Sequence, residues 1–183
     1  MRPLYDCQRP RNQLGRLPTP TVARTVGIPD GRVGTIATLR IMRQLARAAV
    51  RAPNQKIRNT AIQILAGLPP RQWAAEVEHL HSFVRDQIRY LRDPVDVELV
   101  ATPEKTLELC AGDCDDKATL LAALLEATGH PARFLAIGLN GGPFSHVLTQ
   151  SKIGPRWISL ETIIQKPMGW HPVGVTSNYI LDI

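Results

Sequence analysis

The amino-acid sequence predicts an α+β fold in which helices come first and an antiparallel sheet follows. Helical spacing of apolar residues dominates positions 35–129, and strand-like apolar stretches replace it after Pro131. The chain has 183 residues, of which 44% are hydrophobic. This is enough for one domain with a substantial core plus an appendage, and it excludes a disordered chain.

The positive charge is concentrated in the N-terminal third of the chain. Residues 1–60 contain 12 Lys or Arg and two Asp or Glu, whereas residues 61–183 contain 10 and 14, so the net charge of +6 divides into +10 and −4. Residues 1–34 hold five prolines and four glycines and are predicted to form an extended arm, either docked or flexible. The predicted regions are therefore the arm, a basic helical segment over 35–68 and a folded domain over 69–183.

The basic segment is expected to contain two helices. The first covers residues 35–51 with Thr35 as its N-cap, and the second covers about 54–66. Arginines at spacings of three or four share one face of the first helix: Arg40, Arg43, Arg47 and Arg51. This face suits an acidic protein partner first, bulk water second and nucleic acid third, because Tyr5 is the only aromatic residue among the first 60.

The folded domain should begin with a long helix over residues 71–92. Its apolar positions repeat with helical spacing: Val77, Leu80, Val84, Ile88 and Leu91. Residues 95–100 alternate like a short strand or an extended loop, and Thr102 with Pro103 opens a short helix. Another helix should start near Cys114 and end at Gly129. Strands are expected over 132–139, 144–150 and 156–163, and one more short strand can follow in the C-terminal tail.

Cys114 is the residue with the clearest potential for chemistry. It follows Gly112 and Asp113 at a predicted helix start, where backbone N–H groups and the helix dipole favour a thiolate. Asp113 is a good N-cap, and Asp116 three residues later can complete a capping box. Two interpretations stay open on this stretch alone, a reactive cysteine and a small buried residue at a capped helix start. The nearby acidic charge disfavours a thiolate.

A cysteine nucleophile needs a base, and His146 is the histidine on a predicted strand. If the "SKIG" turn is centred between Lys152 and Ile153, His146 lies opposite Ser159, and Glu161 is its diagonal neighbour on the same face. Glu161 is the only carboxylate on these two strands, so it can orient the histidine. A strand-end residue in water is the plain alternative for Glu161.

These segments resemble the transglutaminase-like superfamily of cysteine enzymes, which is related in architecture to papain-like proteases. The resemblance rests on "GDCDDKATLLAALLEATGHPARFLAIG", "FSHVLTQ" and "RWISLET" and covers roughly residues 71–170. It implies a nucleophile-bearing helix packed on an antiparallel sheet, a catalytic triad of Cys114, His146 and Glu161, and acyl transfer by hydrolysis or amide exchange. The family usually has Asp where this chain has Glu161.

The sequence is also similar to bacteriophage members of this superfamily found among virion genes, through "PEKTLELCAGDCDDKATLLAALLEATG" and "KPMGWHPVG". That similarity implies a tail component that contacts other virion proteins through its arm and basic helix and acts on a peptide or cell-wall peptide. The alternative is a structural virion protein with a vestigial triad. No signal peptide, membrane span or cofactor is expected.

The remaining cysteines suggest little. Three cysteines at irregular spacing, Cys7, Cys110 and Cys114, predict no disulfide framework. A metal site or a redox-active disulfide built on Cys110 and Cys114 is a minor alternative, because no second cysteine pair accompanies them.

Overall fold

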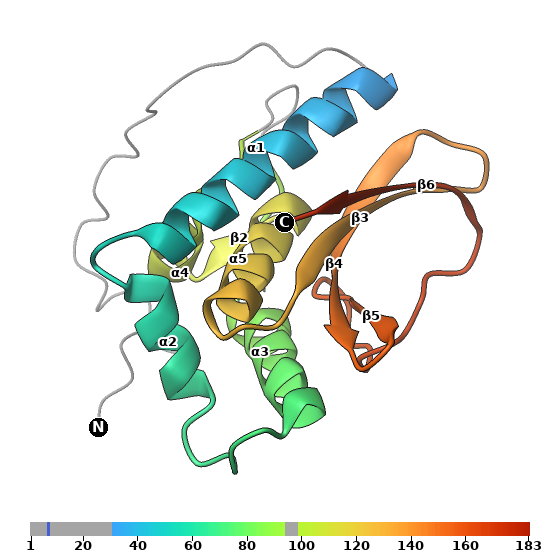
Figure 1. The fold of residues 1–183 in the computed structure, drawn as a ribbon. Coiled ribbons are helices and arrows are strands. Elements are labelled where there is room, and N and C mark those ends of the chain that lie inside the picture. Colours follow the sequence, from blue (N-terminus) through green and yellow to red (C-terminus); the bar gives the residue numbers. More distant parts are fainter. Residues whose placement is uncertain (1–6, 8–30, 94–98) are drawn as a thin grey trace.

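The computed structural model describes residue 7, residues 31–93 and residues 99–183 (Figure 1). The helices are α1 (Gly31–Arg51), α2 (Lys56–Ile64), α3 (Trp73–Gln87), α4 (Pro103–Leu109) and α5 (Cys114–Ala127). The strands are β1 (Arg89–Tyr90), β2 (Ala111–Gly112), β3 (Ala132–Leu139), β4 (Phe144–Ile153), β5 (Arg156–Leu160) and β6 (Val175–Asp182). Strands β3 to β6 form an antiparallel sheet in the order β5-β4-β3-β6, and β1 pairs with β2 in parallel. The predicted α+β class is confirmed.

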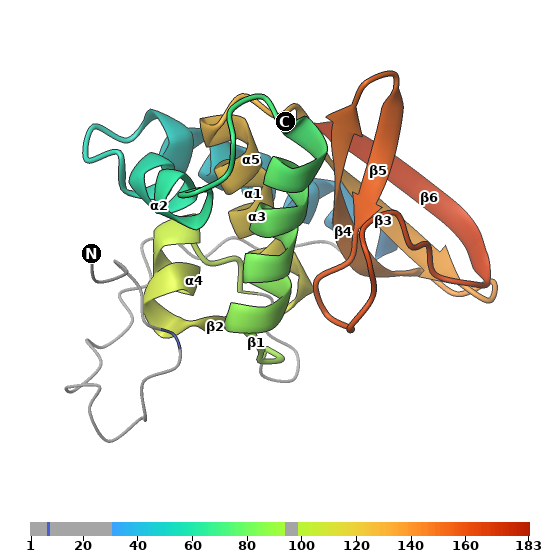
Figure 2. The same cartoon turned by 90° about the horizontal axis from the view of Figure 1, so that it is seen from below.

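Helix α5 lies at the centre of the molecule, between the other helices and the sheet (Figures 1 and 2). It is apolar around most of its circumference, and 12 of its 14 residues are buried. A helix of this kind needs a partner on every side. One hydrophobic cluster joins it to α1 through Met42, to α2 through Ile57, to α3 through Val84 and to the sheet through Phe134. The basic helical segment therefore shares its core with the rest of the described chain.

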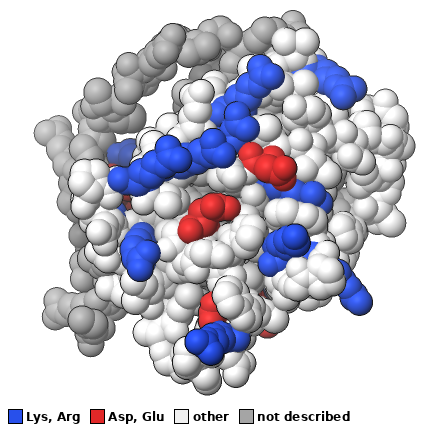
Figure 3. All heavy atoms as spheres, in the orientation of Figure 1, with Lys and Arg blue, Asp and Glu red and all other residues white. Residues whose placement is uncertain are grey.

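The start of the first helix differs from the prediction. Helix α1 begins at Gly31, and Thr35 lies within its first turns, where its Oγ1 donates to the carbonyl of Gly31 at 3.3 Å. Thr35 is therefore not the N-cap, because its hydroxyl bonds to a carbonyl of the preceding turn instead of to a free N–H. The arginine row does follow one side of α1 (Figure 3). In the parts of the chain that the structure describes, no ion pair joins these arginines to an acidic side chain.

Helix α3 is shorter than predicted. Its seam from Val77 to Ile88 is buried, but Leu91 is 60% exposed and lies beyond the helix. The backbone after Ile88 pairs with the strand that leads to α5: Arg89 N–H donates to the Cys110 carbonyl at 2.9 Å, and Leu91 N–H donates to the Gly112 carbonyl at 3.0 Å. These bonds replace further helical turns. Most of the strand expected over 95–100 lies outside the described residues.

The hairpin between β4 and β5 turns two residues later than predicted. Ile153 pairs with Arg156, and Ser159 lies opposite Gln150, so Ser159 is not the partner of His146. The turn falls at Gly154, whose φ of 57° suits glycine at the start of a two-residue hairpin loop. The residue of the β5 strand that lies opposite each β4 residue is therefore four positions later in the sequence than predicted. Because four is even, every side chain stays on the face that the sequence predicts.

Candidate active site

The N-terminus of α5 is held by Asp113. Its carboxylate accepts hydrogen bonds from the backbone N–H groups of Asp115 at 3.0 Å and Asp116 at 3.1 Å. This confirms the predicted N-cap. Gly112 comes directly before it, and a Cβ there would lie 2.5 Å from Cβ of Asp116. Glycine is therefore needed at this position so that the first turn of α5 can pack against the chain that leads into it.

Asp116 secures the start of α5 from its other side. Its Oδ1 accepts from the N–H of Ala101 at 2.7 Å, and the side chain is buried. Burial raises the pKa of Asp116 to about 7, although the backbone N–H groups of Ala101 and Asp113 favour the ionised form. The interaction with the Asp113 N–H is the reciprocal contact expected of a capping box. Asp116 thus fixes the helix start and the segment before α4.

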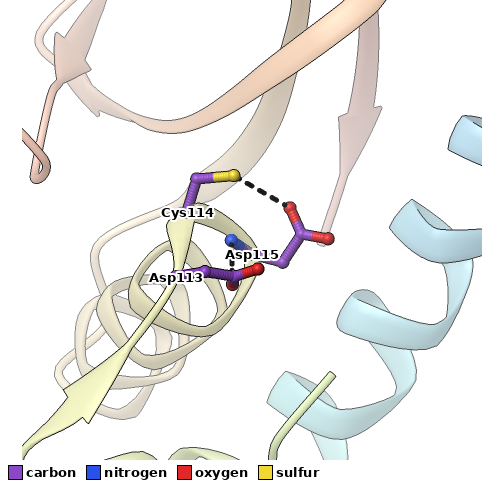
Figure 4. Close-up of side chains that lie close together, drawn as sticks. All are labelled: Asp113, Cys114 and Asp115. Carbon is purple, nitrogen blue, oxygen red and sulfur yellow. Dashed lines mark hydrogen bonds between the residues drawn. The ribbon is translucent and has the colours of Figure 1, made fainter. Parts of the chain in front are cut away.

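Cys114 is a half-buried free thiol in the first position of α5. Its Sγ donates to Oδ1 of Asp115 at 3.4 Å (Figure 4). Burial raises the pKa of the Cys114 thiol far above its ordinary value, and the charges of Asp115 and Asp113 raise it further. The backbone N–H of Val147 acts in the opposite direction, because it can stabilise a thiolate. At neutral pH the resting residue is therefore a neutral thiol.

His146 and Glu161 form a hydrogen-bonded pair at β4 and the end of β5. His146 Nε2 lies 2.7 Å from Oε2 of Glu161, which comes one residue after the end of β5. The Glu161 side chain is 3% exposed, and its Oε1 accepts from the N–H of Ile163 at 2.7 Å. Burial alone would raise its pKa, but the His146 ring and the N–H groups of Ile163 and Ile164 hold the pKa of Glu161 below its ordinary value. Glu161 is thus an ionised carboxylate and not a strand-end residue in water.

The contact between His146 and Glu161 is the diagonal pairing that the sequence predicts, reached through a different register. In the described residues, no hydrogen bond joins Cys114 Sγ directly to the His146 ring. The backbone N–H of Val147, the neighbour of His146 in β4, favours a thiolate at this sulfur. Because Glu161 occupies Nε2, Nδ1 is the ring nitrogen that remains for a proton from the thiol.

The other four histidines have structural partners. His130 Nε2 is 2.9 Å from the Glu76 carboxylate, and its ring packs edge-on against Trp73. His79 Nδ1 donates to a carbonyl of its own helix at 2.8 Å, and His171 Nδ1 is 3.2 Å from the Ser159 hydroxyl. His81 Nε2 donates to the backbone carbonyl of Glu161 at 2.5 Å. None of these four lies on β4, the strand of His146 and of Val147, whose N–H favours a thiolate at Cys114.

The contribution of His81 to the site could not be predicted from the sequence. Its ring is completely buried, burial lowers its pKa, and Nδ1 has no hydrogen-bond partner among the described residues. Because a carbonyl only accepts, Nε2 carries the proton. A neutral His81 on α3 therefore holds the backbone of Glu161. In the sequence, the position of His81 on the apolar seam of a helix, next to Leu80, indicates that its ring is buried. That pattern does not indicate which group the ring binds.

One disulfide contradicts the expectation from cysteine count. Cys7 is bonded to Cys110 with an S–S distance of 2.06 Å, across 103 residues of sequence. Cys110 is thus paired with the arm and not with Cys114. A count of three cannot reveal such a pairing, because it depends on which residues meet in the fold. The bridge leaves Cys114 as the free thiol of the chain.

Comparison with known proteins identifies the family. Residues 58–162, more than half of the chain, match the model of the transglutaminase-like superfamily. The chain therefore belongs to that superfamily. A comparison with curated proteins gives no match.

Two solved structures show the same fold. One is a "putative protease" from Parabacteroides distasonis ATCC 8503, with a TM-score of 0.57 and 14% identity over 81% of this chain and 32% of that chain. The other is calcium-bound LapG from Legionella pneumophila, with a TM-score of 0.50 and 21% identity over 70% of this chain and 75% of that chain. This chain spans about a third of the first protein. At these identities the likeness shows the fold alone.

The acidic residues around Cys114 do not make a calcium cage. Ligand atoms of Asp113, Cys114 and Asp115 lie within 4.8 Å of one another. The Asp113 carboxylate is already bonded to two N–H groups of α5, and the Asp115 carboxylate accepts from the thiol. Calcium prefers six to eight oxygen ligands, and sulfur is not among them. The described residues thus fit a helix start better than a calcium site.

None of the helices in the described part of the chain has the length and hydropathy that a membrane span requires.

The effect of the Asp115 carboxylate on the pKa of the Cys114 thiol can be measured. We expect Asp115→Asn to lower the pKa of Cys114 and to speed its alkylation by iodoacetamide at pH 8 by about 3- to 10-fold, since one pKa unit changes the thiolate fraction tenfold. Asp182→Asn, on the exposed end of β6, is the control and should alkylate at the wild-type rate. An Asp115→Asn rate equal to or below that of the wild type would contradict this electrostatic account.

Proposed function

We propose that this protein is a cysteine acyl-transfer enzyme in which Cys114 is the nucleophile. The observation that carries the proposal is the 2.7 Å hydrogen bond between His146 and the buried carboxylate of Glu161, on the strand whose Val147 N–H favours a thiolate at the free Cys114. A base oriented by an acid beside a thiol is the arrangement that nucleophilic catalysis requires. Membership of the transglutaminase-like superfamily supports the same reaction class.

The reaction begins with a neutral thiol. As the Cys114 sulfur attacks the carbonyl carbon of an amide, His146 Nδ1 takes the thiol proton. The C–N bond then breaks, the amine leaves with that proton from His146, and a thioester remains on the sulfur. Water or a second amine then attacks the thioester carbonyl and loses its proton to His146. The C–S bond breaks, and the sulfur takes that proton from His146, which restores the thiol and the neutral imidazole. Glu161 stays ionised and stabilises the imidazolium formed in each step.

Proton transfer during attack, and not a preformed ion pair, fits the environment of the thiol. The raised pKa of Cys114 disfavours a resting thiolate, so its proton must leave as the new bond forms. The backbone N–H of Cys114 lies at the N-terminal end of α5, where N–H groups have no partner within the helix. It can donate to the oxyanion that develops on the substrate carbonyl.

The glutamate is long enough for the role that aspartate usually has in this superfamily. Its backbone carbonyl is fixed by His81, and both carboxylate oxygens have donors, His146 and Ile163. The extra methylene is therefore accommodated without loss of the hydrogen bond to the base. This geometry favours an active site over a vestigial one.

We further propose that the protein is a phage tail component that acts on a peptide, such as cell-wall peptide, and contacts other virion proteins through its arm and α1. The sequence resemblance to phage members is the main support. The arginine row of α1, which has no ion pair to an acidic side chain within residues 31–93 and 99–183, offers a basic surface to an acidic protein (Figure 3). The bond between Cys7 and Cys110 is compatible with a particle outside the reducing cytoplasm.

One observation favours the alternative of a structural protein with an inactive triad. The thiol of Cys114 donates to Asp115 and makes no hydrogen bond to the His146 ring in the described residues. An inactive site would keep the same fold and the same partner surface. Activity at Cys114 therefore has to be tested chemically.

The enzyme proposal predicts fast acylation of Cys114 by p-nitrophenyl acetate. We expect a burst of p-nitrophenol and an acetyl group on Cys114, detected by mass spectrometry. General-base catalysis contributes about 10²- to 10⁴-fold, so His146→Ala should slow acylation by a factor in this range. Glu161→Gln should slow it at least about tenfold, because it removes the charge that orients and stabilises the imidazole.

Two controls interpret that experiment. Cys114→Ala should abolish the burst, and His79→Ala, on the exposed side of α3, should leave it unchanged. Acylation of the wild-type chain at the rate of free cysteine, with no effect of His146→Ala, would favour the inactive structural protein.

The virion proposal has its own measurement. Mass spectrometry of purified particles of the phage that encodes the chain should detect its peptides at a level comparable to other tail proteins. Peptides found only in the lysate and not in the particles would contradict a tail location.

A further inference from the structure

Lys117 is the one buried cation of α5, a helix whose buried residues are mostly apolar. It is 2% exposed and follows Cys114 by three residues, so both side chains leave neighbouring parts of the same face of α5. Burying an ammonium costs more free energy than burying an apolar chain of the same length. A protein that keeps such a residue in its core commonly uses it at a functional site.

The ammonium of Lys117 binds the C-terminal end of α3. Nζ donates to the carbonyl of Ile88 at 2.6 Å and to that of Arg85 at 3.3 Å. Carbonyls in the last turn of a helix lack partners within it, and a cation there also interacts favourably with the helix dipole. Burial lowers the pKa of Lys117 to about 8, while the charges of Glu161 and Asp86 favour the ammonium and that of Arg85 opposes it.

Helix α3 in turn holds the segment that contains Glu161. His81 Nε2 donates to the Glu161 carbonyl, and Arg85 Nη1 donates to the Lys166 carbonyl at 2.9 Å. Gln165 Nε2 donates to Oδ1 of Asp86 at 2.9 Å. The backbone that carries the acid is therefore attached to α3 at several points and not to the sheet alone.

The end of α3 also reaches the chain that leads to Cys114. Ile88 is followed by β1. The N–H of Arg89, in β1, donates to the Cys110 carbonyl, and the N–H of Leu91, directly after β1, donates to the Gly112 carbonyl. Lys117 thus binds the C-terminal end of α3. This end lies between the part of α3 that holds the Glu161 segment and the strand β1, which pairs with the chain leading to Cys114.

We propose that Lys117 is a positioning residue, whose ammonium fixes α3 against α5 and so sets the place of Glu161 and His146 relative to Cys114. The inference rests on the proposed function for its catalytic consequence, but not for its structural one. Lys117 touches none of the reacting atoms, and it acts through the carbonyls of Arg85 and Ile88.

Lys117→Met tests this inference, because methionine has a similar length and cannot donate. We expect amide hydrogen exchange to rise at least about tenfold at Leu91 and at Ile163, whose N–H binds the Glu161 carboxylate, while Phe134 in the centre of the sheet is unchanged. Acylation of Cys114 by p-nitrophenyl acetate should fall by about 10- to 100-fold, the effect of a small misplacement of catalytic groups.

The controls separate positioning from stability. Lys152→Met, an exposed lysine of β4, should match the wild type in both measurements, and Lys117→Arg, which keeps charged donors, should restore most of the acylation rate. If Lys117→Met does not fold, Lys117→Gln replaces it with the same measurements. Unchanged exchange at Leu91 and Ile163, or a uniform rise that includes Phe134, would overturn the inference. A selective rise in exchange in a chain whose wild type is not acylated would support positioning and contradict the proposed function.

Discussion

Enclosure of α5 is the constraint on which the rest of the structure depends. The helix is apolar on nearly all sides, so it is stable only when α1, α2, α3 and α4 cover one side and the sheet covers the other. Its position determines where its first residue lies. Because Asp113 and Gly112 define that first turn, they fix the place of Cys114, whose thiol is influenced by the backbone N–H of Val147 in β4.

The same enclosure has a chemical cost. A thiol at the start of an exposed helix would gain thiolate character from the dipole, whereas in this protein burial and two carboxylates oppose ionisation. The environment of His146, in contrast, supplies a partner for a positive charge on its ring. Glu161 is ionised, deeply buried and bound to His146, so the imidazole has a fixed orientation and a partner for its positive charge. In the proposed mechanism, this division of roles lets Cys114 be neutral at rest and attack while its proton passes to His146.

Local chemistry in the sequence was sufficient to predict α5, because Asp113 and Gly129 mark its ends and residues 118–125 are almost all Ala or Leu. The pairing of His146 with Glu161 could be predicted even from a wrong hairpin register, since an even shift preserves the faces of both strands. The end of α3 could not be predicted, because backbone pairing with a distant strand stops the helix before Leu91.

The bonding partners of residues that are distant in the sequence could not be predicted for the same reason. The disulfide between Cys7 and Cys110 and the bonds from His81 and Lys117 each join residues far apart in the chain. Their residue types show a capacity to bond, but the partner depends on the completed fold. The polar residues on the apolar faces of α3 and α5 were the visible signs, and both donate hydrogen bonds to backbone carbonyls, His81 to that of Glu161 and Lys117 to that of Ile88.

The tautomer of His146 tests the central claim most directly. If Glu161 accepts a hydrogen bond from Nε2, a neutral His146 ring carries its proton there, and Nδ1 is free to accept the thiol proton. Nitrogen-15 NMR at about pH 8, above the ordinary pKa of histidine, should therefore show a proton on Nε2 and none on Nδ1, and Glu161→Ala should abolish that preference. A His146 ring protonated on Nδ1 alone in the wild-type chain would contradict the assignment of His146 as the base for Cys114.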